Sequence, residues 1–573
     1  MLYALLYFFT VGGFVNTKSK YLSSAFIMVL TSVIVKIIGA VYKIPLTAFI
    51  GAVGRGYFAA AYNLCMPIHA ITMGALPVAL SRLVSKYNAS GNSIMLWGLK
   101  KASFRLFAAV GFAGMGIMLL LAYPYAVYIA AAPQSVYTIL VLAPSVLFSC
   151  MAASYRAFYE GYMDMVPTSG SQFIEALFKL IFGLLLSKMS MAYMYNSYLK
   201  TGMIFGNLFQ NETQALSYIY PFTSAFAMLG VMLGSIVSLL YVQIYNLINR
   251  EKKPGYEKLP VKEARCELIS LALPIMFSSA VQGFFQFLGT SSIQHSLSKL
   301  QLSALQGTYV MPGGAQIARE DLTTYAYGLY SAALDFKNLV PGITMALGIC
   351  AVPVISAAFE TKNNDELTGQ INNILRYTSL LSLLGGGLLV CCGKDMLGLL
   401  YSSSPEIAYG SGSLVVACGF IVVFLSLSGV AVFSVQAIGY PQLSIKSYIV
   451  SGIIRVILNI VLIRFTPLML TGAVAAEGIS YFVMLIMNIR MFKKQTGVRV
   501  KVFSSIIKPM AVFALSVAFF EPLMTILPDF GGIFVNLLIK TVVFAVLFII
   551  LCILLKTLNF RGFFYTIRRK KST

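Results

Sequence analysis

The apolar stretch from Ser23 to Asn63 is the feature that most restricts the fold of this chain. Apart from two lysines, it contains about 27 apolar or small residues in a row, enough for a helix that crosses a bilayer with some tilt. The lysines are Lys36 and Lys43. At about 100° per residue, their spacing places both ammonium groups on one helix stripe, about 10 Å apart along the axis. The first helix is therefore expected to direct two positive charges to one side.

These two lysines are expensive to place in a membrane. A lysine near the centre of a membrane helix costs about 3 kcal/mol on insertion scales. We therefore expect both ammonium groups to face water or an anion. The alternative is that each lysine extends its chain to a different membrane interface.

The composition excludes a soluble protein. Of the 573 residues, 58% are hydrophobic and 11% are charged, and the mean hydropathy is +0.83. These values predict a polytopic membrane protein. The net charge of +23 would suggest nucleic acid in a soluble protein. Here most Lys and Arg residues fall on segments predicted to be cytoplasmic, as the positive-inside rule requires, so we expect no nucleic-acid partner and both termini in the cytoplasm.

The hydropathy pattern predicts an all-α polytopic fold with about 14 transmembrane helices, and the two halves resemble each other. GALPVALSRLV around Pro77 resembles GICAVPVISAAF around Pro353, and the segments around Lys179 and Arg455 match at the same offset of 276 residues. Each half holds six spans, which predicts a parallel repeat of two lobes followed by a C-terminal helix pair. The predicted segments are an N-terminal extension 1–20, an N-lobe 21–247, a cytoplasmic linker 248–265, a C-lobe 266–494, the last helix pair 495–556 and a basic tail 557–573.

The chain shows no pattern for a metal, a cofactor or a cleaved leader. Its eight cysteines have no CxxC spacing, and His69 and His295 are not beside carboxylates. We expect no metal site, no disulfide framework and no cofactor. The first fifteen residues lack a basic start and a small-residue cleavage site, so we interpret them as an over-long start or an interfacial segment.

Charges inside the predicted spans are mostly positive. They are Lys36, Lys43, Lys179, Lys337 and Arg455 against Glu175, Asp335 and Glu477. Glu175 with Lys179, and Glu477 with Arg455, are predicted structural ion pairs. The remaining three lysines against Asp335 predict a cationic cavity that suits an anion. Because the spans are otherwise so apolar, we expect this anion to carry a lipid tail.

The energy for moving such an anion is available without a nucleotide. No GxxxxGK[ST] loop occurs in the sequence, which argues against an ATP-driven pump. Outward movement of a negative charge across an inside-negative membrane gains about 2.3 kcal/mol per 100 mV.

Several segments resemble a known family. They are GAVGRGYFAAAYNL, ITMGALPVALSRLVSKYN, GLYSAAL, VPGITMALGICAVPVISAAF and QAIGYPQ. They are similar to the polysaccharide-transporter branch of the multidrug/oligosaccharidyl-lipid/polysaccharide exporter superfamily, especially MurJ-type lipid II flippases and stage V sporulation protein B. The resemblance implies two six-helix lobes in a bacterial cell membrane. It also implies flipping of an undecaprenyl-pyrophosphate-linked saccharide for peptidoglycan, spore cortex or capsule, alongside membrane lipid and the cell-wall or sporulation synthesis machinery.

The resemblance also implies substrate-binding positions. Lys36 and Lys43 stand where the family's first-helix cations fall, and Lys337, near Asp335, is the candidate for a basic position in the eighth helix. His69 stands near a basic position of the second helix, with a packing histidine as the alternative. Arg55, between two glycines, is either a guide for the headgroup at the outer mouth or a solvated loop residue.

Two other function classes compete with this prediction. A multidrug or organic-cation exporter driven by sodium or protons needs a buried carboxylate in the first lobe. The first two helices contain none, and Glu175 is the available residue. A membrane enzyme needs converging carboxylates or histidines, and the outer acids are scattered without a motif, so we expect no enzyme.

Overall fold

The structure is a computed structural model, and it is almost entirely α-helical. It describes residues 17–74, 76–249, 259–312, 317–526 and 531–557. Within these ranges it contains fifteen α-helices, and eleven helices are long and apolar enough to cross a membrane. The predicted all-α polytopic fold is confirmed. Most of the N-terminal extension 1–20 and of the tail 557–573, and half of the linker 248–265, lie outside the described residues.

Helix α2 (Thr17–Gly74) consists of two arms that meet at Gly51. Gly51 has φ 61° and ψ −176°, a conformation that glycine adopts readily and other residues rarely do. A Cβ at this position would also lie 3.2 Å from the ring of Tyr220. Helix α3 (Leu76–Ala89) follows, so the second arm and α3 together form the second predicted span.

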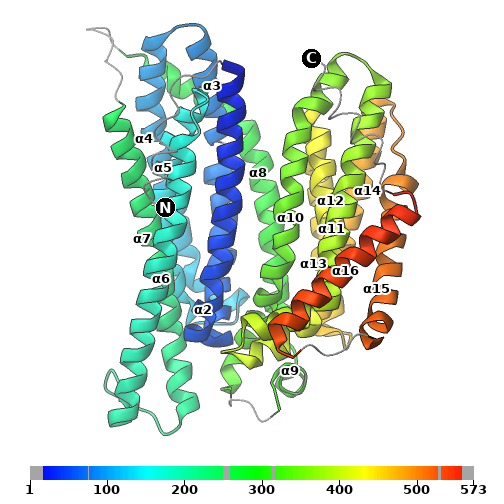
Figure 1. Cartoon of the computed structure of the whole chain (residues 1–573). Coiled ribbons are helices and arrows are strands. Elements are labelled where there is room, and N and C mark those ends of the chain that lie inside the picture. Colours follow the sequence, from blue (N-terminus) through cyan, green and yellow to red (C-terminus); the bar gives the residue numbers. More distant parts are fainter. Residues whose placement is uncertain (1–16, 75, 250–258, 313–316, 527–530, 558–573) are drawn as a thin grey trace. The chain divides into compact units, whose positions relative to one another are not determined.

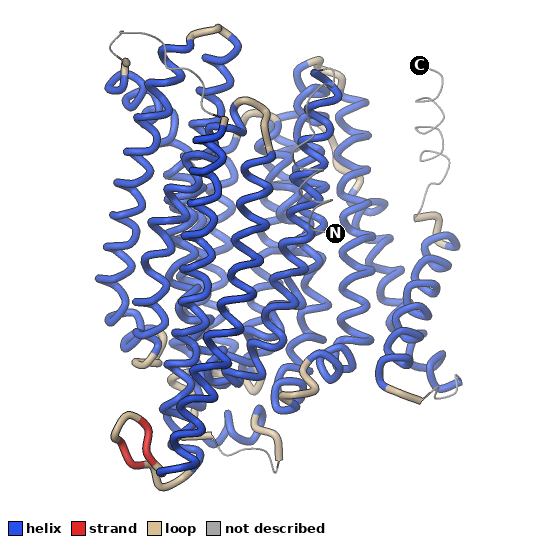
Figure 2. The backbone as a smooth tube through the Cα atoms, turned by 60° about the vertical axis from the view of Figure 1, so that its left-hand side comes forward, coloured by secondary structure: helices blue, strands red, loops and turns tan. Residues whose placement is uncertain are grey.

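The chain divides into two compact units between Ser331 and Ala332, inside helix α10 (Leu322–Glu360). The further elements of the first unit are α4 (Ser93–Pro124), η1 (Tyr125–Ile129), α5 (Ser135–Gly161), α6 (Val166–Thr201), β1 (Met203–Ile204), β2 (Asn207–Leu208), α7 (Glu212–Ile248), α8 (Val261–Leu297), α9 (Leu302–Tyr309) and η2 (Arg319–Asp321). Helices α4, α5, α7 and α6 pack in that order (Figure 1). The two short strands form the antiparallel hairpin between α6 and α7 (Figure 2).

The second unit is built around helix α12, the most buried of its spans. Its elements after α10 are α11 (Asn364–Leu400), α12 (Pro405–Ala437), α13 (Pro441–Arg464), α14 (Met469–Thr496), η3 (Phe503–Ile507), α15 (Lys508–Ile526) and α16 (Ile533–Leu554). Helices α11 and α14 pack on α12, and α15 and α16 pack on α11. Phe544 on α16 and Phe520 on α15 meet in this core with ring centroids 5.7 Å apart.

The number of long segments agrees with the sequence. The described ranges contain fourteen long helical segments, namely the two arms of α2 and the twelve helices α4 to α8 and α10 to α16. The compact units divide inside α10, whereas the internal repeat places the lobe boundary in the linker 248–265. The difference arises because α8 packs on α2, α3 and α4, helices of the first half of the repeat. The predicted lobe boundaries therefore stay a prediction.

Helices α2 and α10 approach each other closely through two glycines. A Cβ added to Gly328 would overlap the carbonyl oxygen of Ala52, and one added to Gly56 would overlap the carbonyl oxygen of Thr324. Small residues four apart on both helices allow this backbone contact, which is how helices associate where the hydrophobic effect is weak. The contact fixes the start of α10 against the second arm of α2.

We expect Gly328→Ala to destabilise the protein. Its methyl group must push α10 away from Ala52, and overpacking of this kind costs about 1–3 kcal/mol. Gly398→Ala on α11 is the matched control, because nothing lies within 4 Å of a Cβ there. The thermal stability of both variants is measured by heating the detergent-solubilised protein and recording how much of its monodisperse chromatographic peak remains. An unchanged midpoint for Gly328→Ala would contradict the packing.

Candidate functional site

The two lysines of the first helix keep the geometry that the sequence predicts. The first arm of α2 is helical through both positions, so Lys36 and Lys43 share one stripe. Lys36 is exposed and Lys43 is half-buried, whereas the neighbouring Tyr42 is only 1% exposed. The hydroxyl of Thr47 donates a hydrogen bond to the carbonyl oxygen of Lys43 at 2.6 Å. The substrate role of the two ammonium groups stays a prediction.

A second charge group lies between α5, α6 and α7 of the first unit. Arg156 donates to the carboxylate of Glu175 at 2.8 Å and to the hydroxyl of Ser238. Lys179 donates to the hydroxyl of Tyr62 at 2.8 Å and lies 5.1 Å from the centre of that ring. Glu175 thus has an ionic partner that the spacing of α6 did not predict.

A third charge group is buried in the second unit. Glu477 on α14 accepts from Lys337 on α10 at 2.6 Å and faces Arg455 on α13 at 3.3 Å. All three residues are at most 5% exposed. The predicted pairing of Glu477 with Arg455 is present, and Lys337 shares the same carboxylate. One buried carboxylate therefore contacts two buried cations and ties α14 to α10 and α13.

We expect Glu477→Gln to unfold or strongly destabilise the second unit. The change removes the carboxylate that two buried cations share, and breaking a buried pair typically costs about 3–5 kcal/mol. The double variant Glu477→Gln/Lys337→Met should be more stable than the single variant, because one uncompensated charge is removed as well. Glu360→Gln, an exposed carboxylate at the end of α10, is the control. If Glu477→Gln unfolded at the same midpoint as the wild type, this account would be contradicted.

Arg55 is not the exposed loop residue that the sequence suggested. It is 4% exposed and lies inside the second arm of α2, because the chain reverses at Gly51 and becomes helical again at once. Its guanidinium donates to the hydroxyl of Thr47 at 2.7 Å and to the carbonyl oxygen of Ser331 at 3.3 Å. The interpretation as a solvated loop residue is wrong, and the structure gives Arg55 a role in joining α2 to α10.

A buried carboxylate, Asp321, extends the contact between α2 and α10. It precedes α10 and is 4% exposed. Its oxygens accept from the hydroxyl of Tyr57 on α2 at 2.8 Å and from the hydroxyl of Ser217 on α7. Tyr327 on α10 accepts a further hydrogen bond from Asn63 on α2. Sequence reasoning counted Asp321 among scattered outer acids and missed this role.

The protonation of Asp321 makes this contact depend on pH. Burial raises the pKa of the Asp321 carboxyl above its ordinary value, and Glu320 acts in the same direction, while the hydrogen bonds from Ser217 and Tyr57 oppose the shift. With a raised pKa, the folded state holds the proton more tightly than the unfolded state. The stability that this group contributes is therefore full at acidic pH and is lost as the pH rises through the folded-state pKa.

We expect Asp321→Asn to flatten part of the pH profile of stability. The amide resembles the protonated carboxyl and does not titrate. Unfolding midpoints between about pH 4 and pH 7 measure the difference in slope from the wild type. Asp365→Asn, an exposed residue at the start of α11, should leave the slope unchanged. An equal slope in Asp321→Asn and wild type would contradict the assignment.

Two further predicted positions lie on α2 and α10. His69 is half-buried on α2, and its Nε2 has no hydrogen-bond partner among the described residues. Asp335 is half-buried on α10, two residues from Lys337. Among the described residues, no group of three or more His, Cys, Asp or Glu side chains is placed to hold a metal ion. The binding roles of His69 and Asp335 stay predictions.

The fold defines a multi-pass membrane protein, because eleven helices in the described ranges are long and apolar enough to cross a membrane. Residues 21–359 match the family described as "Polysaccharide biosynthesis protein", and the chain belongs to this family. It is 23% identical over 515 residues to lipid II flippase MurJ of Bacillus subtilis, with 85% of each chain covered. It is 22% identical to stage V sporulation protein B of the same organism, with 68% of each covered.

Solved structures support the same fold. A lipid II flippase MurJ in an inward closed conformation matches with a TM-score of 0.63 and 14% identity, over 94% of this chain and 98% of that one. An inward-facing multidrug resistance MATE family transporter of the MOP superfamily matches with a TM-score of 0.57 and 14% identity, over 82% of this chain and 98% of that one. The predicted family and its likeness to MurJ and stage V sporulation protein B are confirmed. These proteins are transporters and flippases, not enzymes, which agrees with the expectation for this chain.

Proposed function

We propose that this protein is a flippase for an undecaprenyl-pyrophosphate-linked saccharide, such as lipid II or a related cortex or capsule precursor. It moves this lipid from the inner to the outer leaflet by alternating access, and both termini lie in the cytoplasm. The relative named as a lipid II flippase, which matches over 85% of each chain, supports this proposal. Membership in a family described by polysaccharide biosynthesis supports it as well.

The observation that carries the proposal is the placement of two lysines within the apolar first arm of α2. Lys36 and Lys43 lie on one stripe of this arm, whose sequence contains no carboxylate. A pyrophosphate is the kind of ligand that such cations bind, because charge-assisted hydrogen bonds to phosphate are strong where water is scarce.

Within this proposal the lysines have different roles. Lys36, which is exposed, and Lys43, which is half-buried, bind the pyrophosphate directly. Lys337 is already held by Glu477, so it attracts the anion without binding it directly. The inside-negative membrane potential favours outward movement of the bound anion by about 2.3 kcal/mol per charge per 100 mV.

The second candidate is an exporter of drugs or organic cations coupled to sodium or protons. The likeness to a multidrug resistance MATE family transporter favours it at the level of the fold. Such a transporter needs a carboxylate that binds the coupling cation. Glu175 on α6 is engaged by Arg156 at 2.8 Å, which leaves it poorly suited to a coupling cation.

We expect Lys36→Ala and Lys43→Ala each to lower flipping at least tenfold, because each loses a charge-assisted hydrogen bond worth about 1.5–3 kcal/mol. Lys36→Arg and Lys43→Arg should retain activity. Rescue of bacterial cells depleted of their lipid II flippase, and flipping of a fluorescent lipid II in proteoliposomes, measure the effect. Lys188→Ala, an exposed lysine on α6, is the control.

Two results would contradict the proposal. Wild-type flipping in both alanine variants would remove the first-helix lysines from the site. Failure of the wild-type chain to flip the lipid, together with export of a cationic dye driven by a sodium or proton gradient, would favour the second candidate.

A further inference from the structure

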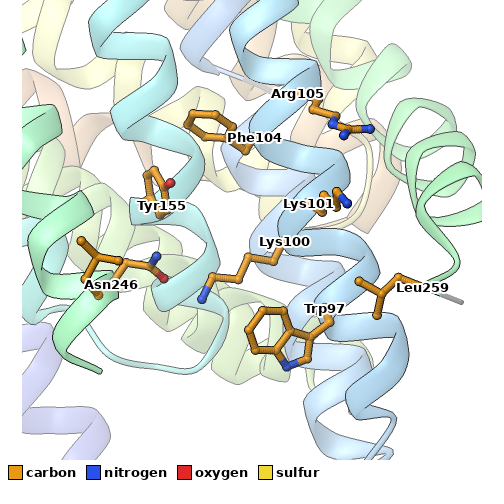
Figure 3. A pocket seen from close by; sticks show the side chains of 9 residues that line it. Trp97, Lys100, Lys101, Phe104, Arg105, Tyr155, Asn246 and Leu259 are labelled. Atoms are coloured by element: carbon orange, nitrogen blue, oxygen red, sulfur yellow. The ribbon is translucent and has the colours of Figure 1, made fainter. Parts of the chain in front are cut away.

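A pocket of about 580 Å³ lies in the first unit, apart from the charge groups described above. It lies where α4 begins, α7 ends and the chain enters α8 (Figure 3). Its lining is basic and aromatic: Trp97, Lys100, Lys101, Phe104, Arg105, Tyr155, Asn246, Leu247 and Leu259. By the distribution of lysine and arginine, this end of the unit is predicted to face the cytoplasm.

Among the described residues, the lining contains three cations of α4, two from one turn and one from the next, and no carboxylate. Lys100 extends from α4 toward Asn246 on α7, with Trp97 beside it (Figure 3). Its ammonium lies 5.3 Å from the centre of the Trp97 ring and 5.2 Å from that of Phe158. A cation near the face of an aromatic ring is attracted by the ring electrons, so these rings help to hold the ammonium in place. Lys101 and Arg105 project from the other side of α4 in Figure 3, and both are exposed and line the same pocket, so its lining is positively charged on both sides of the helix.

An apolar stripe on α7 leads away from the pocket. Leu240, Ile244 and Leu247 follow one another at helical spacing and are 48%, 55% and 64% exposed. Leu247 also lines the pocket. Exposed apolar side chains on a membrane helix suit contact with lipid chains. Phe104 and Tyr155, with ring centroids 5.5 Å apart, continue the apolar surface inside the pocket.

We propose that this pocket binds the phosphate headgroup of an anionic glycerophospholipid from the adjacent leaflet. Lys100, Lys101 and Arg105 contact the phosphate and the negatively charged headgroup, and Asn246 supplies a polar contact from the facing helix. The acyl chains lie along the stripe of α7. Basic pockets between membrane helices on the cytoplasmic side suit such headgroups.

The apolar stripe distinguishes a lipid from a soluble phosphate. A free phosphate or a nucleotide would use the three cations and would gain nothing from Leu240, Ile244 and Leu247. A lipid uses both features at once, since its phosphate and its chains are joined. The site is also separate from Lys36 and Lys43, so it serves a resident lipid rather than the transported one.

The chain offers its own reporter for this site, because Trp97 is its single tryptophan. The full-length protein is reconstituted in vesicles that contain either brominated phosphatidylglycerol or brominated phosphatidylcholine, and quenching of tryptophan fluorescence is recorded. We expect stronger quenching by the brominated anionic lipid in the wild type. Each cation removed should lower this preference by roughly fivefold, so Lys100→Gln should weaken it and Lys100→Gln/Lys101→Gln/Arg105→Gln should abolish it.

A matched variant separates the pocket from the general charge of the protein. Arg490→Gln/Lys493→Gln/Lys494→Gln removes three exposed cations from the end of α14 and should keep the preference. Equal quenching by both lipids in the wild type would overturn the proposal, as would a preference retained in the pocket variant. If added inorganic phosphate abolished the preference for the anionic lipid, the pocket would bind a soluble phosphate, and the proposal that its ligand is a lipid would be wrong. Monodisperse chromatography checks that each variant is folded.

Discussion

This structure depends on one constraint: positively charged lysine and arginine side chains must be accommodated inside apolar helices. In the second unit, Glu477 lies between Lys337 and Arg455 and thereby ties α14 to α10 and α13. In the first unit, Arg156 and Glu175 form an ion pair, while Lys179 contacts a hydroxyl and aromatic rings. Each arrangement gives a charged side chain inside the helices a charged or polar partner, without which its burial would cost several kcal/mol. The packing of these helices and the placement of their charged side chains therefore depend on each other.

The sequence predicts the helices well because hydropathy is a local property. The fourteen long segments, the all-α class and the stripe of Lys36 and Lys43 all follow from composition and helical spacing. The turn at Gly51 was harder to foresee, because a hydropathy pattern marks the end of one span and the start of the next but not how few residues lie between them. That short turn places Arg55 inside a helix, where a loop had been expected.

The charge partners were only partly predictable, for a related reason. The spacing of Glu175 and Lys179 suggests a pair on one helix face, but Arg156 reaches Glu175 from α5, a contact set by how α5 and α6 pack. Lys337 and Glu477 are 140 residues apart and meet because α10 packs near α14. Asp321 looked like one of several outer acids, and only its burial against Tyr57 and Ser217 distinguishes it. Contacts of this kind carry no periodic signal in a single sequence.

The carboxylate of Glu477 makes the contacts of three helices depend on one another. Its Oε2 faces Lys337 on α10 and its Oε1 faces Arg455 on α13, so a shift of α14 disturbs both pairs at once. Separating a buried pair is costly, because each charge then lies in a low-dielectric region without the partner that stabilised it. The positions of α10, α13 and α14 are therefore set by this carboxylate as well as by apolar packing.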